Sequence, residues 1–212
     1  MTRDWRAWHA PYDDPGSPLA QRLASVRSHV ASWLAARPAG ATVISMCAGE
    51  GRDLLPLPPG IRARLVELDP GNAAVARAAA GPDVDVLVAD AGVTDAYEGF
   101  VPADLALVCG VFGNVSDDDV RATVAELPHL CAPGATVIWT RHRRPPDLTP
   151  AIRGWFAENG FAERAFDAPA DELWSVGVHV LTGETKAFRP GRRMFAFTGD
   201  GADAMARPGD RA

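Results

Sequence analysis

Residues 43–53, VISMCAGEGRD, have the residue types and spacing of a nucleotide-binding turn. A short apolar run ends there in a turn with two glycines, Gly49 and Gly51, two positions apart. Glycine has no Cβ, so the backbone of such a turn can lie directly against a ligand. Sixteen residues after Gly51, Glu67 ends a second apolar run. A carboxylate there can accept hydrogen bonds from both hydroxyls of a ribose, so the two segments predict half of a nucleoside-binding site.

Small or polar residues also follow three later apolar runs. Asp90-Ala91 comes after residues 83–88, the segment CGVFGN (109–114) comes after residues 105–108, and Arg141-His142 comes after residues 136–140. If these runs are parallel strands, their carboxyl ends share one edge of the sheet, where ligands of open α/β sheets bind. We therefore predict that these side chains border one site.

Predicted strands and helices alternate along the chain and must position these residues. Short, continuous apolar strands between helical segments indicate a parallel sheet covered on both faces, and two closing strands after the last helix indicate an antiparallel edge. We predict a single α/β domain with a mostly parallel seven-stranded sheet and helices on both faces. The predicted strands are Thr42–Met46, Arg62–Glu67, Asp83–Val88, Leu105–Val108, Thr136–Thr140, Phe161–Phe166 and Ser175–Leu181, and the predicted helices lie near Pro18–Ala36, Arg52–Leu55, Asn72–Ala80, Asp117–Leu127 and Thr149–Asn159.

Three segments are predicted along the chain. Residues 1–37 hold an aromatic N-terminal segment and a helix with Ser17 as its N-cap. Residues 38–198 form the nucleoside-binding domain, and residues 199–212, which are rich in Gly, Asp and Arg, form a flexible tail.

Composition and charge narrow the class of protein. Hydrophobic residues make up 47% and charged residues 23% of the chain, an ordinary globular balance, and no apolar run approaches the roughly 18 residues of a membrane span. A net charge of −6 argues against a general nucleic-acid binder. The three cysteines are too widely spaced for a zinc site or a disulfide framework, and no signal core follows Met1. We therefore expect a cytoplasmic monomer or homodimer that acts on a small molecule and binds no metal, nucleic acid or membrane.

The glycine turn, the acidic strand end and the Asp90-Ala91 pair together resemble the class I S-adenosylmethionine-dependent methyltransferases. In that family an acidic-x-Gly-x-Gly-x-Gly motif follows the first strand, an acidic residue ends the second, and an Asp-Ala or similar pair follows the third. The likeness covers roughly residues 41–140 and is most typical at LVELDP (65–70) before an alanine-rich helix. Within the family the chain resembles a group of actinobacterial methyltransferases. The resemblance implies a Rossmann-like methyltransferase fold, with S-adenosylmethionine as methyl donor and S-adenosylhomocysteine as product.

The resemblance also assigns residues to this cofactor. Gly49 and Gly51 would lie under the methionine part, Glu67 would bind the ribose hydroxyls, and Leu68 would pack on the adenine. Asp90 would accept from the adenine amino group, close to the amide of Ala91. The full set of implied cofactor contacts is Ser45, Cys47, Ala48, Gly49, Gly51, Glu67, Leu68, Asp90, Ala91, Cys109 and Gly110.

Two positions of the turn depart from the family motif. Cys47 stands where the first glycine usually is, although a positive φ is disfavoured for a residue with a Cβ. Ser45 replaces the usual acidic residue, which leaves the ammonium group of the cofactor to backbone carbonyls, Glu50 or Asp53.

The second strand is followed by a choice between two carboxylates. Glu67 lies at the predicted strand tip, whereas Asp69-Pro70 has the pattern of a turn or helix cap. We therefore assign Glu67 to the ribose, and the alternative is that both carboxylates are solvated loop residues.

The candidates for the acceptor side are Trp8, Tyr12, Phe112, Asn114 and Arg141, with His142 as a candidate catalytic base. Trp8 and Tyr12 could form a lid that excludes water, or could only anchor the terminus to the core. Asn114 could bind a ligand or cap the helix that begins near Asp117. Arg141 and His142 could hold an anion and accept a proton, or belong to a solvated basic loop.

Methyl transfer suits a sequence without an evident catalytic triad or metal cluster. The sulfonium is already activated, so the protein chiefly has to align the nucleophile with the methyl group. We therefore predict methyl transfer to an O or N atom of a small molecule by in-line displacement. Two alternatives stay open. One is a regulatory protein that binds the cofactor without catalysis, and the other is an NAD(P)-dependent oxidoreductase, whose Gly-x-Gly-x-x-Gly motif is interrupted here by Leu54.

Overall fold

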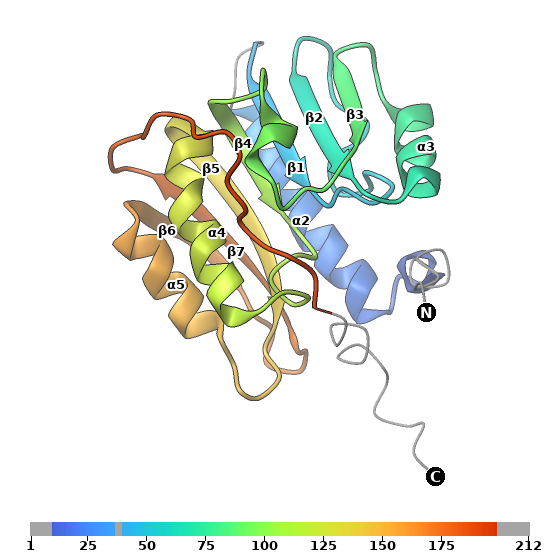
Figure 1. Ribbon diagram of the computed structural model, residues 1–212. Helices are drawn as coiled ribbons and strands as arrows, with labels where there is room; N and C mark the ends of the chain where they lie inside the picture. Colours follow the sequence, from blue (N-terminus) through green and yellow to red (C-terminus); the bar gives the residue numbers. More distant parts are fainter. Residues whose placement is uncertain (1–9, 37–39, 199–212) are drawn as a thin grey trace.

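A central sheet lies between two layers of helices in the computed structural model, which describes residues 10–36 and 40–198 (Figure 1). The sheet order is β3-β2-β1-β4-β5-β7-β6, with β1 to β5 parallel and β7 antiparallel to both of its neighbours. The predicted seven-stranded sheet, mostly parallel with an antiparallel edge, is therefore confirmed. The strands are β1 Thr42–Met46, β2 Arg62–Glu67, β3 Val84–Val88, β4 Ala103–Val108, β5 Cys131–His142, β6 Phe161–Asp167 and β7 Trp174–Leu181.

The described residues form four α-helices, two on each face of the sheet. One face carries α2 Pro18–Ala35 and α3 Pro70–Ala79, and the other carries α4 Asp117–Leu130 and α5 Thr149–Glu158. Two short 3-10 helices, η1 Ala10–Asp13 and η2 Thr94–Tyr97, precede α2 and follow β3. Because both faces are covered, β1 and β4 are buried over almost their whole length. None of the described helices has the length and apolar character to cross a membrane.

The helix α2 begins where the sequence predicts. Ser17 is its N-cap and accepts a hydrogen bond from the Ala20 amide at 3.1 Å. Pro18 occupies the first turn, where a backbone N–H has no partner within the helix in any case. One face of α2 buries Val26 and Val30 against the sheet, and Arg22 lies on the same face, one turn before Val26.

The helix predicted at residues 52–55 is absent. Residues 52–54 form turns, and Pro56 comes two residues later. The residue before a proline is disfavoured in the helical conformation, because the proline ring clashes with its backbone. The chain therefore leaves the glycine turn as an irregular loop, which keeps Arg52 and Asp53 at the carboxyl edge of the sheet.

Residues 182–198, here called the C-terminal strap, run from β7 back along α4 to the carboxyl edge of the sheet, and Figure 1 shows them in red. The strap is tied along its length by backbone hydrogen bonds, from the Lys186 amide to the Pro128 carbonyl at 2.9 Å, from the Met194 amide to the Gly92 carbonyl at 2.8 Å and from the Thr198 amide to the Asn114 carbonyl at 3.0 Å. The sequence does not predict the strap, because no periodic pattern marks it. The tail predicted at 199–212 lies outside the described residues.

Candidate functional site

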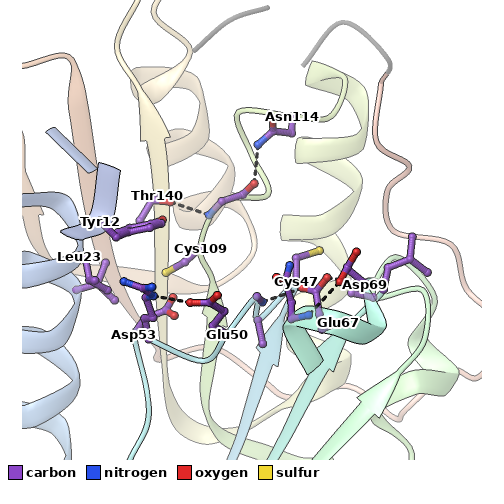
Figure 2. A pocket seen from close by; sticks show the side chains of 18 of the residues that line it. Tyr12, Leu23, Cys47, Glu50, Asp53, Glu67, Asp69, Cys109, Asn114 and Thr140 are labelled. Atoms are coloured by element: carbon purple, nitrogen blue, oxygen red, sulfur yellow. Dashed lines mark hydrogen bonds and ion pairs between the residues drawn. The ribbon is translucent and has the colours of Figure 1, made fainter. Parts of the chain in front are cut away.

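A cavity of about 400 Å³ opens at the carboxyl ends of the central strands (Figure 2). Its lining comes from η1, α2, the turn after β1, the end of β2, the start of α3, the loops after β3 and β4, the end of β5, and the C-terminal strap. This volume lies in the range of small-molecule and cofactor sites. The lining residues are Tyr12, Arg22, Leu23, Val26, Cys47, Ala48, Gly49, Glu50, Arg52, Asp53, Glu67, Leu68, Asp69, Pro70, Asn72, Asp90, Ala91, Cys109, Gly110, Asn114, Thr140 and Phe197.

The turn after β1 adopts a left-handed backbone at Cys47 and Gly49, where φ is 53° and 55°. Within the described ranges Cys47 is the one non-glycine residue with a positive φ, and it stands where the family motif has a glycine. Burial, together with the carboxylates of Glu67 and Asp90, raises the pKa of the Cys47 thiol far above its usual range. The side chain is therefore a neutral thiol rather than a nucleophile.

The Glu67 carboxylate links the ends of β1 and β2. Its Oε2 accepts from the Gly49 amide at 2.7 Å, and its Oε1 accepts from the Asp69 amide at 2.8 Å (Figure 2). Glu67 is 9% exposed, so these two bonds hold the carboxylate in one orientation at the cavity wall. Because each carboxylate oxygen has two lone-pair sites, each can accept a further bond from a ligand hydroxyl.

Asp69 is the N-cap of α3, as the Asp69-Pro70 pattern predicts. Its Oδ1 accepts from the amides of Gly71 and Asn72 at 2.8 and 2.9 Å. Between the two carboxylates, Leu68 is 69% exposed and borders the cavity. An exposed apolar side chain beside a cavity favours a flat apolar ligand group, such as an aromatic base, lying against it.

The loop after β3 brings Asp90 to the cavity and joins it to the C-terminal strap. Asp90 Oδ1 accepts from the Gly92 amide at 2.8 Å, and its Oδ2 pairs with Arg193 of the strap at 2.9 Å. Four residues further along the strap, Phe197 also borders the cavity. The strap is therefore part of the candidate site.

Two hydrogen bonds between side chains and the backbone of Gly110 fix the loop after β4. The Gly110 amide donates to Thr140 Oγ1 at 2.9 Å, and Asn114 Nδ2 donates to the Gly110 carbonyl at 2.7 Å. The alternative that Asn114 caps the next helix is wrong, because Ser116 is the N-cap of α4 and accepts from the Asp119 amide at 3.1 Å. Asn114 and Gly110 therefore stay available to the cavity that they border.

Charged residues gather where η1 and α2 meet the turn after β1. Arg22 is 7% exposed and donates from Nη2 to Tyr12 Oη at 3.0 Å. Arg52 pairs with Asp13 at 2.9 Å and with Glu50 at 2.6 Å. These bonds hold η1 against the cavity, so that Tyr12 forms part of its lining.

Among the cofactor contacts that the family resemblance implies, all but Ser45 and Gly51 border the cavity. Ser45 is 2% exposed and lies in β1 between Leu65 and Leu107 of the neighbouring strands. Gly51 packs on the core, since a Cβ there would lie 2.7 Å from Leu55 Cδ1. In the structure these two positions belong to the core rather than to the lining.

Among the acceptor-side candidates, Tyr12 and Asn114 border the cavity, whereas Phe112, Arg141 and His142 do not. Phe112 is fully buried and packs on the Trp139 ring with 5.9 Å between centroids, so it belongs to the core. Trp8 lies outside the described residues.

Arg141 and His142 are placed beyond the cavity because β5 extends two residues past its predicted end at Thr140. Arg141 donates to the Phe112 carbonyl and pairs with Asp117 at 3.4 Å. His142 Nδ1 accepts from the Arg144 amide at 3.3 Å. Burial, followed by the charges of Arg141 and Arg144, lowers the pKa of His142, so its imidazole is neutral near pH 7 but does not reach the lining.

Several lining residues are not indicated by the motifs. The sequence did give an indication of Arg22, because it is a charged residue on an otherwise apolar face of α2. That face buries Val26 and Val30. The sequence gave no indication of Phe197, since it lies on an irregular segment far along the chain. The remaining residues of this kind are Leu23, Val26, Asn72 and Thr140.

Comparisons of the sequence with family models and with curated proteins gave no match. Among solved structures, the chain is similar to magnesium protoporphyrin IX methyltransferase from Synechocystis with bound S-adenosylmethionine, at 18% identity and a TM-score of 0.64 over 84% of this chain and 91% of that one. It is similar to the N-methyltransferase NodS from Bradyrhizobium japonicum at 13% identity and a TM-score of 0.60, over 81% and 99% of the two chains. An O-methyltransferase family protein from Burkholderia thailandensis matches at 18% identity and a TM-score of 0.64, over 87% and 62%. The chain therefore has the Rossmann-like fold of these methyltransferases.

Proposed function

We propose that this protein is an S-adenosylmethionine-dependent methyltransferase that methylates an O or N atom of a small molecule. The observation that carries the proposal is the Glu67 carboxylate, held between the glycine turn and the start of α3 at the wall of a cofactor-sized cavity. The fold similarity supports it, because the similar structures include methyltransferases with bound S-adenosylmethionine or S-adenosylhomocysteine.

The lining suits the parts of this cofactor in spatial order. Both ribose hydroxyls would donate to Glu67, whose oxygens are already oriented by two amides. The adenine would lie beside the exposed Leu68, with its amino group toward Asp90. The methionine part would then cross the turn at Cys47 and Gly49 toward the end of β4.

When bound, the cofactor would supply an activated methyl group on a positively charged sulfur. The contribution of the chain is to position the acceptor and to exclude water. Asn114 suits the first task, because its Nδ2 is fixed on the Gly110 carbonyl and its Oδ1 can accept from an acceptor N–H or O–H. Tyr12 suits the second, since its bond with Arg22 and the Arg52–Asp13 ion pair hold η1 against the cavity. The residues placed here do not include His142, which lies outside the lining.

Calorimetric titration with S-adenosylhomocysteine and with NAD tests the choice of cofactor. We expect S-adenosylhomocysteine to bind and NAD to bind far more weakly. Tight NAD binding without a response to S-adenosylhomocysteine would overturn the proposal in favour of an oxidoreductase.

Catalysis is tested separately, by incubating the protein with methyl-labelled S-adenosylmethionine and pooled small metabolites. We expect mass spectrometry to find a labelled product whose formation requires the intact protein. Cofactor binding with no labelled product in any pool would favour the regulatory alternative over the enzyme.

A further inference from the structure

The C-terminal strap joins two loops that both border the cavity. On the loop after β3, the Gly92 carbonyl accepts from the Met194 amide at 2.8 Å. On the loop after β4, the Asn114 carbonyl accepts from the Thr198 amide at 3.0 Å, and each loop also forms a β-bridge with the strap. Figure 1 shows the strap in red beside α4 as it runs to this edge of the sheet. The strap thus fixes the loop that carries Asp90 to the loop that carries Asn114.

A second set of contacts holds the strap on α4, away from the cavity. Arg189 donates from Nε and Nη2 to the two carboxylate oxygens of Glu126, and the Glu126 side chain is 8% exposed. Two parallel bonds of this kind fix the orientation of both groups. Neither residue lines the cavity, so this anchor can be removed without removing a ligand contact.

Phe197 is the residue of the strap that borders the cavity, and it is 45% exposed. Two residues earlier, Phe195 is buried in the core, and the two rings meet edge to face with 6.1 Å between centroids. On the end of β2, the exposed Leu68 borders the same cavity. An aromatic ring that packs on the core and is still exposed at a cavity loses water-accessible apolar surface when a ligand covers it, which favours binding.

We propose that the strap is a positioning element whose order depends on the cofactor. Phe197 covers the nucleoside of the bound cofactor, and the backbone bonds at Gly92 and Asn114 extend this order to the loop that positions the acceptor. This inference rests on the proposed function, because it takes the nucleoside to lie on Glu67 beside the loop after β3. A coupling between two binding events is reciprocal, so an acceptor that contacts Asn114 also tightens cofactor binding.

Titration with S-adenosylhomocysteine tests the contact made by Phe197. In calorimetric titrations of the full chain, Phe197→Ala is expected to lower the affinity by about 5- to 100-fold, the range for the loss of an aromatic ring that packs on a base. Phe197→Leu, which stays apolar, should retain part of the affinity. Phe188→Ala is the matched control, because Phe188 lies on the same strap but packs against the core outside the cavity lining. Its affinity should equal that of the unaltered protein.

Hydrogen exchange measured at saturating S-adenosylhomocysteine tests the coupling. We expect the ligand to slow exchange at residues 193–198 and 110–116 of the unaltered protein, and to slow it less at residues 110–116 of Phe197→Ala although both proteins are saturated. Arg189→Met removes the anchor on α4. It should speed exchange in the free strap and lower the affinity in proportion to the fraction of molecules with an ordered strap. Arg192→Met is its control, since Arg192 takes part in none of the ion pairs among the described residues.

Three results would overturn the proposal while leaving the cofactor in place. The first is an unaltered affinity for S-adenosylhomocysteine in Phe197→Ala, and the second is equal exchange at residues 110–116 in the saturated variant and the saturated unaltered protein. The third is faster exchange in the strap of Arg189→Met with an unaltered affinity. If Arg189→Met does not fold, the measurements on Phe197→Ala decide, because that side chain is exposed and its loss leaves the core intact. If S-adenosylhomocysteine does not bind the unaltered protein, the proposed function itself fails.

Discussion

Replacing Glu67 by glutamine is expected to weaken the fold and nucleoside binding together, because one carboxylate serves both. Glu67 accepts from the Gly49 amide at 2.7 Å and from the Asp69 amide at 2.8 Å. A glutamine side chain presents one oxygen and one NH₂ group in their place. Only one of the two backbone amides then keeps an acceptor, and the other faces a second donor.

The size of the effect follows from the burial of this residue, which is 9% exposed. A hydrogen bond to a charged group contributes about 1.5–3 kcal/mol, and a buried donor left without an acceptor costs about 1–3 kcal/mol. We therefore expect the free energy of unfolding to fall by about 2–3 kcal/mol. For a chain of 212 residues, this corresponds to a decrease in Tm of about 5–10 °C.

Scanning calorimetry and titration with S-adenosylhomocysteine measure the two consequences of Glu67→Gln separately. The affinity is expected to fall by about 100-fold or more, because the ribose hydroxyls lose a charged acceptor. Asp69→Asn is the matched control: it makes the same chemical change two residues away but keeps the oxygen that caps α3, so Tm and affinity should change little. A Glu67→Gln protein with unaltered Tm and affinity would refute the assignment of Glu67 as a shared bridge.

Three further changes test the turn after β1, the C-terminal strap and the core beside β7. Cys47→Gly is expected to be more stable than Cys47→Ala by about 1 kcal/mol in denaturant titrations, against the usual order, because the φ of 53° favours glycine; an alanine variant at least as stable as the glycine one would contradict this. Gly92→Ala puts a Cβ 2.2 Å from the Phe195 carbonyl oxygen and should speed hydrogen exchange in the C-terminal strap. Gly113→Ala is the control, because its Cβ would lie 3.5 Å from its nearest neighbour and should leave exchange unchanged. Equal exchange in the two variants would count against the packing of the strap. Burial lowers the pKa of His179 from 6.5 to about 4, so between these two values the unfolded chain takes up a proton that the folded protein excludes. The free energy of unfolding should therefore fall as the pH drops through this range, by about 2 kcal/mol near pH 5. His179→Gln should lose this part of the pH dependence, and identical profiles for the two proteins would refute the assignment.

The strands beside the site could be predicted because two features of the sequence mark each of them. Thr42–Met46 and Arg62–Glu67 each combine a continuous apolar run with an abrupt stop at a turn or a carboxylate, and the structure gives both strands the same bounds. β5 is longer than predicted. It begins at Cys131, where Pro133 and Gly134 indicate a turn by local rules, yet Cys131 pairs with Ala103 of β4. Pairing with a neighbouring strand here outweighs the local preference.

The ends of the candidate site could not be predicted, because tertiary contacts set them. Asp90 follows β3 in a recognisable motif, but its ion-pair partner Arg193 comes 103 residues later on a strap without periodicity. Phe197 reaches the cavity on the same strap. Arg22 appears in the sequence as a polar residue on an apolar helix face, and only the closed fold shows that this face ends at a cavity.

The difference from the family motif at Ser45 agrees with the packing around it. Ser45 is 2% exposed between Leu65 and Leu107, and a carboxylate in such a place needs a hydrogen-bonded partner to offset the loss of water. Asp53 lies beyond the glycine turn, on the irregular loop that Pro56 prevents from becoming a helix, and lines the cavity with Arg22 nearby. The loop therefore brings to the cavity a carboxyl group that the strand does not carry. An acidic residue can contact a ligand here only where it has access to the cavity, and Asp53 has that access whereas position 45 does not.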